Sequence, residues 1–139
     1  MADVSRPVPV PDSDTEPYWE GAKRKELLIQ RCKSCGKRWF PPSAACPACS
    51  AFDHEWASVS GKGEVVTYTV VHRPPGPAFA GRTPYVLAVI ELAEGPRMLT
   101  NVVECDPSEV SIGMPVEVTF EEIAPDAVLP QFRPRVEKE

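Results

Sequence analysis

Two motifs, Cys32-Lys-Ser-Cys35 and Cys46-Pro-Ala-Cys49, decide how this chain folds, and ten residues separate them. Each Cys-x-x-Cys motif forms a tight knuckle that directs both sulfurs at one point. Two facing knuckles place four thiolates in a tetrahedron, which is the geometry of structural zinc sites. The spacing therefore predicts one metal bound by the four cysteines, with two disulfides or four free thiols as the alternative.

The start of the chain bears on the choice between metal and disulfides. No apolar segment lies between Met1 and Asp14, so a secretion signal is not expected, and no run approaches the ~20 apolar residues of a membrane span. We therefore expect a cytoplasmic protein. Thiols stay reduced in the cytosol, which favours a metal. Structural zinc is the predicted cofactor, and iron is the alternative that elemental analysis would test.

Two further residues can be weighed as additions to this site. His54 follows the second motif closely, but four thiolates already complete a structural zinc site, so a ligand role is not expected. Cys105 lies in an apolar, strand-like run far along the chain and is expected to be a small core residue. Trp39 and Phe40 are expected to cover the metal and keep water off the sulfurs.

Charge is unevenly distributed along the 139 residues. Lys23 to Arg38 hold seven basic residues and one acid, whereas Glu64 to Gln131 hold three basic residues and ten acids, and the chain nets −5. A nucleic-acid binder should carry basic charge over its binding face, so the acidic second half argues against one. The basic run either offsets a tetrathiolate zinc site, with a formal charge of about −2, or binds an acidic ligand or partner.

The pattern divides the chain into four parts. Residues 1–14 form a proline-rich flexible arm, and residues 126–139 form a tail without a clear element. Residues 15–60 hold a short helix, expected from Glu16 to Lys25 and capped by Ser13, Asp14 or Thr15, and then the zinc ribbon. Residues 61–125 hold β-branched runs expected as strands at 64–73, 84–92, 97–105 and 114–123. Four or five antiparallel strands with glycine turns predict a mostly β protein ending in a five-stranded OB-fold barrel, with an SH3-like barrel as the alternative.

Several segments together resemble a known family of zinc-ribbon plus OB-fold proteins. They are Pro17-Tyr18-Trp19-Glu20, Phe40-Pro41-Pro42 between the cysteine pairs, the run from Gly61 to Arg73, Pro84-Tyr85, Glu94 to Asn101, and Ile112 to Val118. Members of that family are acyl-CoA-associated accessory proteins of thiolases, hydroxymethylglutaryl-CoA synthases and steroid side-chain aldolases. The resemblance covers the chain from about Pro17 to Ile123 and is specific to the family, not to one partner enzyme.

The resemblance implies a role in an assembly. The helix and the rubredoxin-like ribbon would dock on partner subunits, the four cysteines would bind structural zinc, and the barrel would lie beside an acyl-CoA site. The adjacent aromatics Tyr18 and Trp19 point in different directions on a helix, so one can pack internally while the other faces a partner. Both are candidate docking residues.

Catalytic motifs are scarce in this sequence. It contains no G-x-S-x-G elbow and no P-loop, and the one conceivable nucleophile–base pair is Cys105 with His72. We therefore do not expect an enzyme in its own right. Four residues near strand ends are candidates for holding an acyl-CoA: His72, Arg73, Arg82 and Arg97.

The sequence thus predicts a non-catalytic subunit that docks on a thiolase-superfamily enzyme, helps complete its thioester site and forms a hetero-oligomer, with a dimeric core as one arrangement. Two alternatives remain: a nucleic-acid-binding zinc-ribbon and OB-fold protein, and a small independent thioester hydrolase. Because a ribbon of this size depends on its metal, Cys32→Ser is expected to unfold the N-terminal third and leave the barrel folded.

Overall fold

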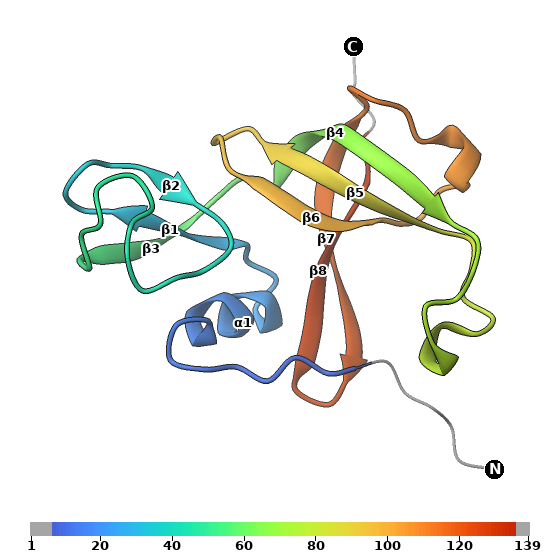
Figure 1. Ribbon diagram of the computed structural model, residues 1–139, viewed down its shortest axis with the longest axis horizontal. Helices are drawn as coiled ribbons and strands as arrows, with labels where there is room; N and C mark the ends of the chain where they lie inside the picture. The colour runs from blue at the N-terminus through green and yellow to red at the C-terminus, as the bar shows by residue number, and fades with distance from the viewer. Residues whose placement is uncertain (1–6, 136–139) are drawn as a thin grey trace.

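The computed structural model describes residues 7–135, which form a small zinc-ribbon lobe beside a β-barrel, with one helix packed below the junction (Figure 1). The predicted fold class is confirmed: mostly strands, one N-terminal helix, a ribbon and a closed five-stranded barrel. Part of the predicted arm, residues 1–6, lies outside the described residues, and residues 7–12 carry neither helix nor strand. No helix in the described part of the chain has the length and apolar character that crossing a membrane requires.

The helix α1 spans Glu16–Lys23, two residues shorter than expected. Thr15 occupies the N-cap position, but its side chain makes no capping hydrogen bond. Asp12 shapes the turn instead, because its carboxylate accepts hydrogen bonds from the backbone N–H groups of Asp14 and Thr15, both at 3.0 Å. Its backbone carbonyl also accepts from Glu16 N–H at 2.8 Å, so the aspartate three residues earlier starts the helix.

The ribbon contains a three-stranded antiparallel sheet in the order β2-β1-β3. Its strands are β1 (Leu28–Cys32), β2 (Arg38–Trp39) and β3 (His54–Ser58). The first cysteine knuckle connects β1 to β2, and the second lies in the long connection from β2 to β3. The ribbon sheet therefore carries both knuckles.

A short linker, Val59–Gly61, joins the ribbon to the barrel and is bonded to both. Val59 N–H donates to Leu27 C=O at 3.0 Å, on the ribbon side, and the Gly61 carbonyl accepts from Val118 N–H at 2.8 Å, in the barrel. Gly61 has φ +80°, and a Cβ placed there would overlap a Val118 methyl carbon. The turn therefore needs glycine both for its backbone angle and for its close contact.

The barrel is closed and has the strand order β4-β5-β6-β8-β7. Its strands are β4 (Lys62–Val71), β5 (Tyr85–Leu92), β6 (Arg97–Val102), β7 (Pro115–Ala124) and β8 (Ala127–Pro134). Two single-turn 3₁₀ helices, η1 (Pro77–Phe79) and η2 (Pro107–Glu109), lie in the longer connections. Every pairing is antiparallel except β6 with β8, which are parallel and register at one pair, Val102 with Phe132.

The last strand corrects the sequence prediction. The segment after residue 125 was expected to be a tail without a clear element, but Ala127–Pro134 forms β8, so the barrel continues to Pro134. Proline normally argues against a strand because it lacks an N–H donor. Here β8 pairs along its length with β7 alone and meets β6 at a single pair, so the missing donor of Pro130 costs little.

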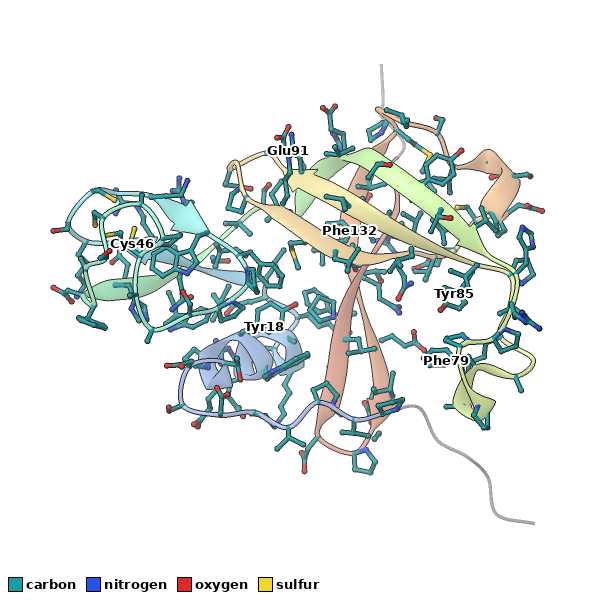
Figure 2. The ribbon with its side chains drawn as sticks, viewed as in Figure 1. Tyr18, Cys46, Phe79, Tyr85, Glu91 and Phe132 are labelled. Carbon is teal, nitrogen blue, oxygen red and sulfur yellow. The ribbon has the colours of Figure 1, made fainter. Side chains whose placement is uncertain are left out.

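One hydrophobic core connects the two lobes. Strand β5 alternates strictly, with Val86, Ala88, Ile90 and Leu92 buried between outward-facing residues, and Phe132 of β8 is fully buried near the barrel centre (Figure 2). The same buried cluster includes residues from the other lobe: Tyr18, Leu27 and Ile29. The ribbon and helix therefore cover one end of the barrel core.

Candidate functional site: a four-cysteine metal centre and a cleft at the lobe junction

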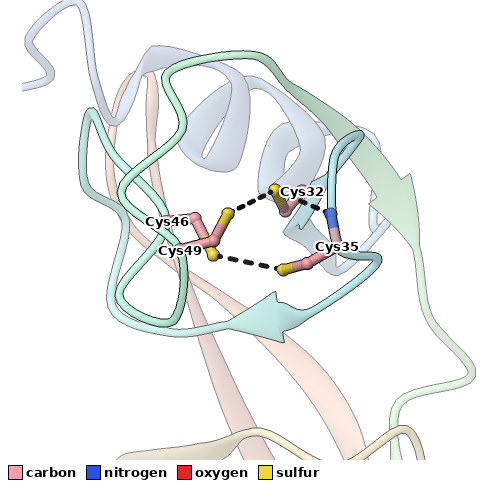
Figure 3. A group of neighbouring side chains, drawn as sticks. All are labelled: Cys32, Cys35, Cys46 and Cys49. Atoms are coloured by element: carbon pink, nitrogen blue, oxygen red, sulfur yellow. Dashed lines mark hydrogen bonds between the residues drawn. The ribbon is translucent and has the colours of Figure 1, made fainter.

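The sulfur atoms of Cys32, Cys35, Cys46 and Cys49 all lie within 4.8 Å of one another (Figure 3). The closest pairs join one knuckle to the other: Cys32 to Cys49 at 3.5 Å and Cys35 to Cys46 at 3.7 Å. Four sulfurs at the usual Zn–S bond length of about 2.3 Å have tetrahedral edges of about 3.8 Å. The cluster therefore has the donor set and spacing of a structural zinc site, as the sequence predicted.

Each knuckle turns back through a residue in the left-handed region. Gly36 has φ +79° and Ser50 has φ +66°, and their N–H groups donate to the carbonyls of Cys32 and Cys46 at 2.9 and 2.8 Å. Backbone N–H groups also point at sulfur: that of Cys35 lies 3.4 Å from Cys32 Sγ. Such donors stabilise a thiolate, which is the form that binds a metal.

The ionisation of the cysteines agrees with this geometry. The Cys35 backbone N–H lowers the pKa of Cys32 to about 6. At Cys49 the Ala51 backbone N–H is the largest single influence and favours the thiolate, yet the hydrogen bonds with the other three cysteines and burial together outweigh it and raise the pKa to about 12. Thiolates this close repel one another, so only a cation allows all four to be charged together.

One side of the metal centre is closed by protein. Cys32 and Cys46 are buried in a small cluster with Trp39, while Cys35 and Cys49 are exposed. The prediction that Trp39 covers the site is therefore confirmed. The same prediction for Phe40 is wrong, because Phe40 points to the other side and packs against Tyr18 at a ring-centroid distance of 5.5 Å.

A buried amide holds the loop that carries the second knuckle. Gln30 on β1 accepts a hydrogen bond from Ser43 N–H at 2.8 Å and donates to Ser43 C=O at 2.7 Å. Its amide nitrogen also donates to His54 Nε2 at 3.0 Å, and His54 Nδ1 donates to Phe52 C=O at 3.1 Å. The imidazole is therefore occupied by two hydrogen bonds and is not part of the metal cluster, as expected.

The predicted docking residues lie at the junction of the lobes. Tyr18 is buried in the shared core, and burial raises its pKa well above the ordinary value. Trp19 is half-buried and packs edge-on against Tyr18 at 4.9 Å. Both line a groove of about 380 Å³, which we call the helix groove, between α1, the Phe40–Pro42 segment, β6 and β8. It is formed by residues 15, 18, 19, 40–42, 99–101 and 129–131, all of them uncharged.

The four candidate ligand-binding residues do not converge. Arg97 lies at the start of β6, pairs with Glu91 at 3.3 Å and stands at the opposite end of β5 from Tyr85, about 20 Å away at 3.3 Å per residue. His72, Arg73 and Arg82 are exposed at the other end, around the loop that contains η1.

Only Arg82 of this group lines the hollow next to the helix groove. This hollow, which we call the loop hollow, has a volume of about 180 Å³. The residues around it are Phe79, Arg82, Tyr85, Asn101, Val102, Val103, Glu121 and Gln131. Phe79 and Tyr85 face one another at a ring-centroid distance of 5.8 Å (Figure 2). His72 lines a separate hollow of about 300 Å³, together with Pro84 and Asp106.

Cys105 is half-buried against the core, past the end of β6, so the strand is three residues shorter than expected. Burial raises the pKa of its thiol, and the carboxylates of Glu109 and Asp106 raise it further. No hydrogen bond joins Cys105 to His72 within residues 7–135, and a protonated thiol beside two acids is a poor nucleophile.

Sequence reasoning missed Leu99, Asn101 and Gln131, which line the junction. Leu99 is 65% exposed on the outer face of β6 and borders the helix groove, and Asn101 and Gln131 border both the groove and the loop hollow. Strict alternation along β6 could have placed Leu99 and Asn101 on one face. Gln131 could be placed only after β8 was recognised as a strand.

Comparison with protein families finds the same two parts, a ribbon and a barrel, with the boundary between the two matches inside β3. Residues 19–55 match the family described as "ChsH2, rubredoxin-like zinc ribbon domain", and residues 56–121 match the one described as "ChsH2, C-terminal OB-fold domain". The zinc of the ribbon family fits the four-sulfur cluster, so the cofactor prediction is confirmed.

Individual relatives carry several descriptions. A "DUF35 domain-containing scaffold protein" of Methanocaldococcus jannaschii is 44% identical over 110 residues, which is 78% of this chain and 77% of that protein. A "probable enoyl-CoA hydratase alpha subunit" of Thermomonospora curvata is 43% identical over 134 residues, or 96% of this chain. The chain spans only 41% of that hydratase subunit's length.

Two solved structures also resemble this chain. A chain of an assembly titled "Ltp2-ChsH2(DUF35) aldolase" is 43% identical, with a TM-score of 0.83 over 92% of this chain and 99% of that one. A DUF35-family protein of Sulfolobus solfataricus, 16% identical with a TM-score of 0.63, shares the fold.

Proposed function

Because this chain belongs to the ChsH2 family of rubredoxin-like zinc-ribbon and OB-fold proteins, we propose that it is a non-catalytic accessory subunit of an acyl-CoA-processing enzyme. We further propose that the partner is a thiolase-superfamily enzyme and that the two form a hetero-oligomer. The observation that carries this proposal is the likeness to nearly the whole of a chain from a named aldolase assembly. Relatives described as scaffold proteins and alpha subunits support the same role.

The chemistry of the described residues supports a subunit without catalysis of its own. Cys105 is kept protonated by burial and acidic neighbours, and the remaining four cysteines form the metal cluster. A nucleophile for thioester chemistry therefore comes from the partner. The zinc is structural, since four protein ligands leave no open coordination position.

We place the docking surface at the helix groove. Its lining is uncharged in a chain where 25% of residues are charged, and Leu99 stands exposed at its edge. An apolar surface on the partner fits such a lining, because neither side would bury an unpaired charge. Trp19 supplies the aromatic side chain, while Tyr18 supports it from the core.

Co-expression with a thiolase-superfamily enzyme from the same organism tests the proposal. We expect the two chains to elute together from size-exclusion chromatography, and a chain that elutes alone would contradict the proposal. Leu99→Asp should weaken the complex at least tenfold, since it buries a carboxylate in an apolar contact.

Ile112 offers a matched control for that substitution. It is 71% exposed, close to the exposure of Leu99, but it lies between η2 and β7, away from the groove residues. Ile112→Asp should leave the complex intact. Turnover of acyl-CoA by the isolated chain would instead support the thioester-hydrolase alternative.

A further inference from the structure

The ribbon sheet β2-β1-β3 has two outer edges, and the sequence protects only one of them. Strand β2 spans only Arg38–Trp39 and is followed by Phe40-Pro41-Pro42, so its edge is short and the two prolines have no N–H to offer. The other edge belongs to β3, His54–Ser58, which has five residues and no proline (Figure 1). An unprotected strand edge is a template for pairing with another chain.

The hydrogen bonds between β1 and β3 determine which backbone groups of β3 face outward. Val59 N–H donates to Leu27 C=O at 3.0 Å, so this pair is a hydrogen-bonded one. Bonded and non-bonded pairs alternate along an antiparallel ladder, so residues 57 and 55 also bond to β1, opposite Ile29 and Arg31. The N–H and C=O groups that point away from β1 are those of the remaining three residues of the strand, His54, Trp56 and Ser58.

These outward backbone groups are unpaired within residues 7–135. Strand β3 pairs with β1 alone, and no backbone hydrogen bond from another segment of the described chain reaches the outward groups. The one acidic side chain of β3 does not guard the edge either. Glu55 forms an ion pair with Arg31 of β1 at 2.9 Å, which holds its carboxylate over the sheet. The β3 edge is therefore open to a further strand.

The residues of β3 favour a second copy of the same strand as that partner. Two copies placed antiparallel about a two-fold axis at Trp56 bring residue 54 of one copy opposite residue 58 of the other. The outward N–H groups of each copy then meet the outward C=O groups of the other. Glu55 lies opposite Ala57 of the second copy, so no like charges face each other, and the two Trp56 side chains become cross-strand neighbours. The edge is thus self-complementary, as a two-fold interface requires.

We propose that the β3 edge pairs with the same edge of a second copy of this chain, so that the two ribbon sheets join into one antiparallel sheet across a two-fold axis. This inference does not depend on the proposed function. No residue of β3 lines the helix groove, so both surfaces can be occupied at once. A contact of five residues per copy buries less than the roughly 1,200 Å² of a stable complex, so the dimer should depend on protein concentration.

Sedimentation velocity of the full-length, zinc-loaded chain tests this pairing. The sedimentation coefficient should rise as the protein concentration is raised to about 1 mM. Substitutions at Ala57 test the register, because Ala57 faces Glu55 of the second copy. Ala57→Lys should tighten the dimer and Ala57→Glu should weaken it, each at least about twofold, since the dimer contains this charge pair twice. Ser58→Pro removes an outward N–H but no bond to β1 and should weaken the dimer at least about fivefold.

Ile112→Asp is the control, because Ile112 is an exposed apolar residue of the barrel and its replacement should leave the dimer unchanged. A chain that stays monomeric at about 1 mM would overturn the inference. Equal dimerisation of Ala57→Lys and Ala57→Glu would overturn it as well, and so would loss of the dimer in Ile112→Asp alone.

Amide hydrogen exchange provides a second measurement on the same samples. The amides of Trp56 and Ser58 should exchange more slowly as the concentration of the chain rises. Slower exchange only after an acyl-CoA enzyme is added would assign the edge to that enzyme and overturn the inference. Zinc content and the dispersion of the NMR spectrum report the folding of each variant. Should Ser58→Pro misfold, the two Ala57 variants still decide the question.

Discussion

Removal of the zinc is expected to destabilise the barrel as well as the ribbon. The reason is the shared core: Leu27 and Ile29, which lead into the first knuckle, are 2% and 1% exposed and belong to the same buried cluster as the barrel residues. If the ribbon unfolds, both side chains leave that cluster. This revises the sequence-based expectation that the barrel would survive Cys32→Ser.

The size of the effect follows from the burial. Full burial of an aliphatic side chain contributes about 1.5–3 kcal/mol, so exposing Leu27 and Ile29 removes about 3–6 kcal/mol. Domains of this kind have a total unfolding free energy of about 5–15 kcal/mol. At about 4 °C per kcal/mol, the barrel should melt at least about 12 °C lower without zinc.

Two probes separate the lobes in one melting experiment. All three tryptophans, Trp19, Trp39 and Trp56, precede the barrel, so their fluorescence reports the helix and ribbon. The methyl signals of Ile90, which is fully buried in β5, report the barrel. Both probes should shift together when zinc is chelated or Cys32 is replaced by serine.

The fifth cysteine provides the control for these measurements. Cys105→Ser lies outside the metal cluster and should retain zinc with a small change in Tm. A barrel whose Ile90 signals melt at the same temperature with and without zinc would refute the shared-core reasoning.

Three other predictions follow from single contacts. Gly61→Ala should lower the unfolding free energy by about 2–5 kcal/mol in a urea melt, because alanine meets both the positive φ and the clash with Val118. Gly81→Ala, where φ is +81° but no atom lies within 4 Å of the added Cβ, should lower it by only about 1–2 kcal/mol, and equal losses in the two variants would contradict this reasoning. Gln30→Leu leaves both backbone groups of the loop at Ser43 unpaired and should speed zinc transfer to a chromophoric chelator; an unchanged rate would show that the loop holds without it. Burial raises the pKa of Tyr18, so its contribution to the unfolding free energy is complete below about pH 10 and falls above it, where Tyr18 of the unfolded chain ionises. Tyr18→Phe should therefore reduce the loss of unfolding free energy measured between about pH 9 and 11, and identical pH profiles of the two proteins would be contrary evidence.

The sequence was sufficient to predict the parts of the fold that depend on local chemistry. The Cys-x-x-Cys spacing predicted the metal cluster, and the β-branched runs predicted β4 through β7, because both signals are contained within a few residues. Strand β8 was missed because Pro130 and Pro134 weaken its propensity. The sequence signal for a turn there was the Pro125-Asp126 pair, and in the structure Asp126 has φ +64° in the turn between β7 and β8.

The helix groove could not be predicted from the sequence, for a physical reason. It is formed where β6 and β8, distant in sequence, run beside α1, so its lining residues share no local pattern. The position of Phe40 away from the metal site has, in contrast, a local cause. Its neighbour Trp39 packs on the sulfurs, and alternation along an extended segment turns Phe40 to the opposite face, toward Tyr18.

The linker between the lobes has a mechanical consequence. Val59 and Gly61 are bonded to the ribbon and the barrel respectively, and Ser60 N–H donates to Glu94 Oε2 at 2.9 Å on the β5–β6 turn. These hydrogen bonds and the shared core hold the two lobes in one relative orientation. A protein that binds the ribbon therefore also fixes the orientation of the barrel. The angle between the barrel and its target is then determined by the fold of this chain before the two proteins meet.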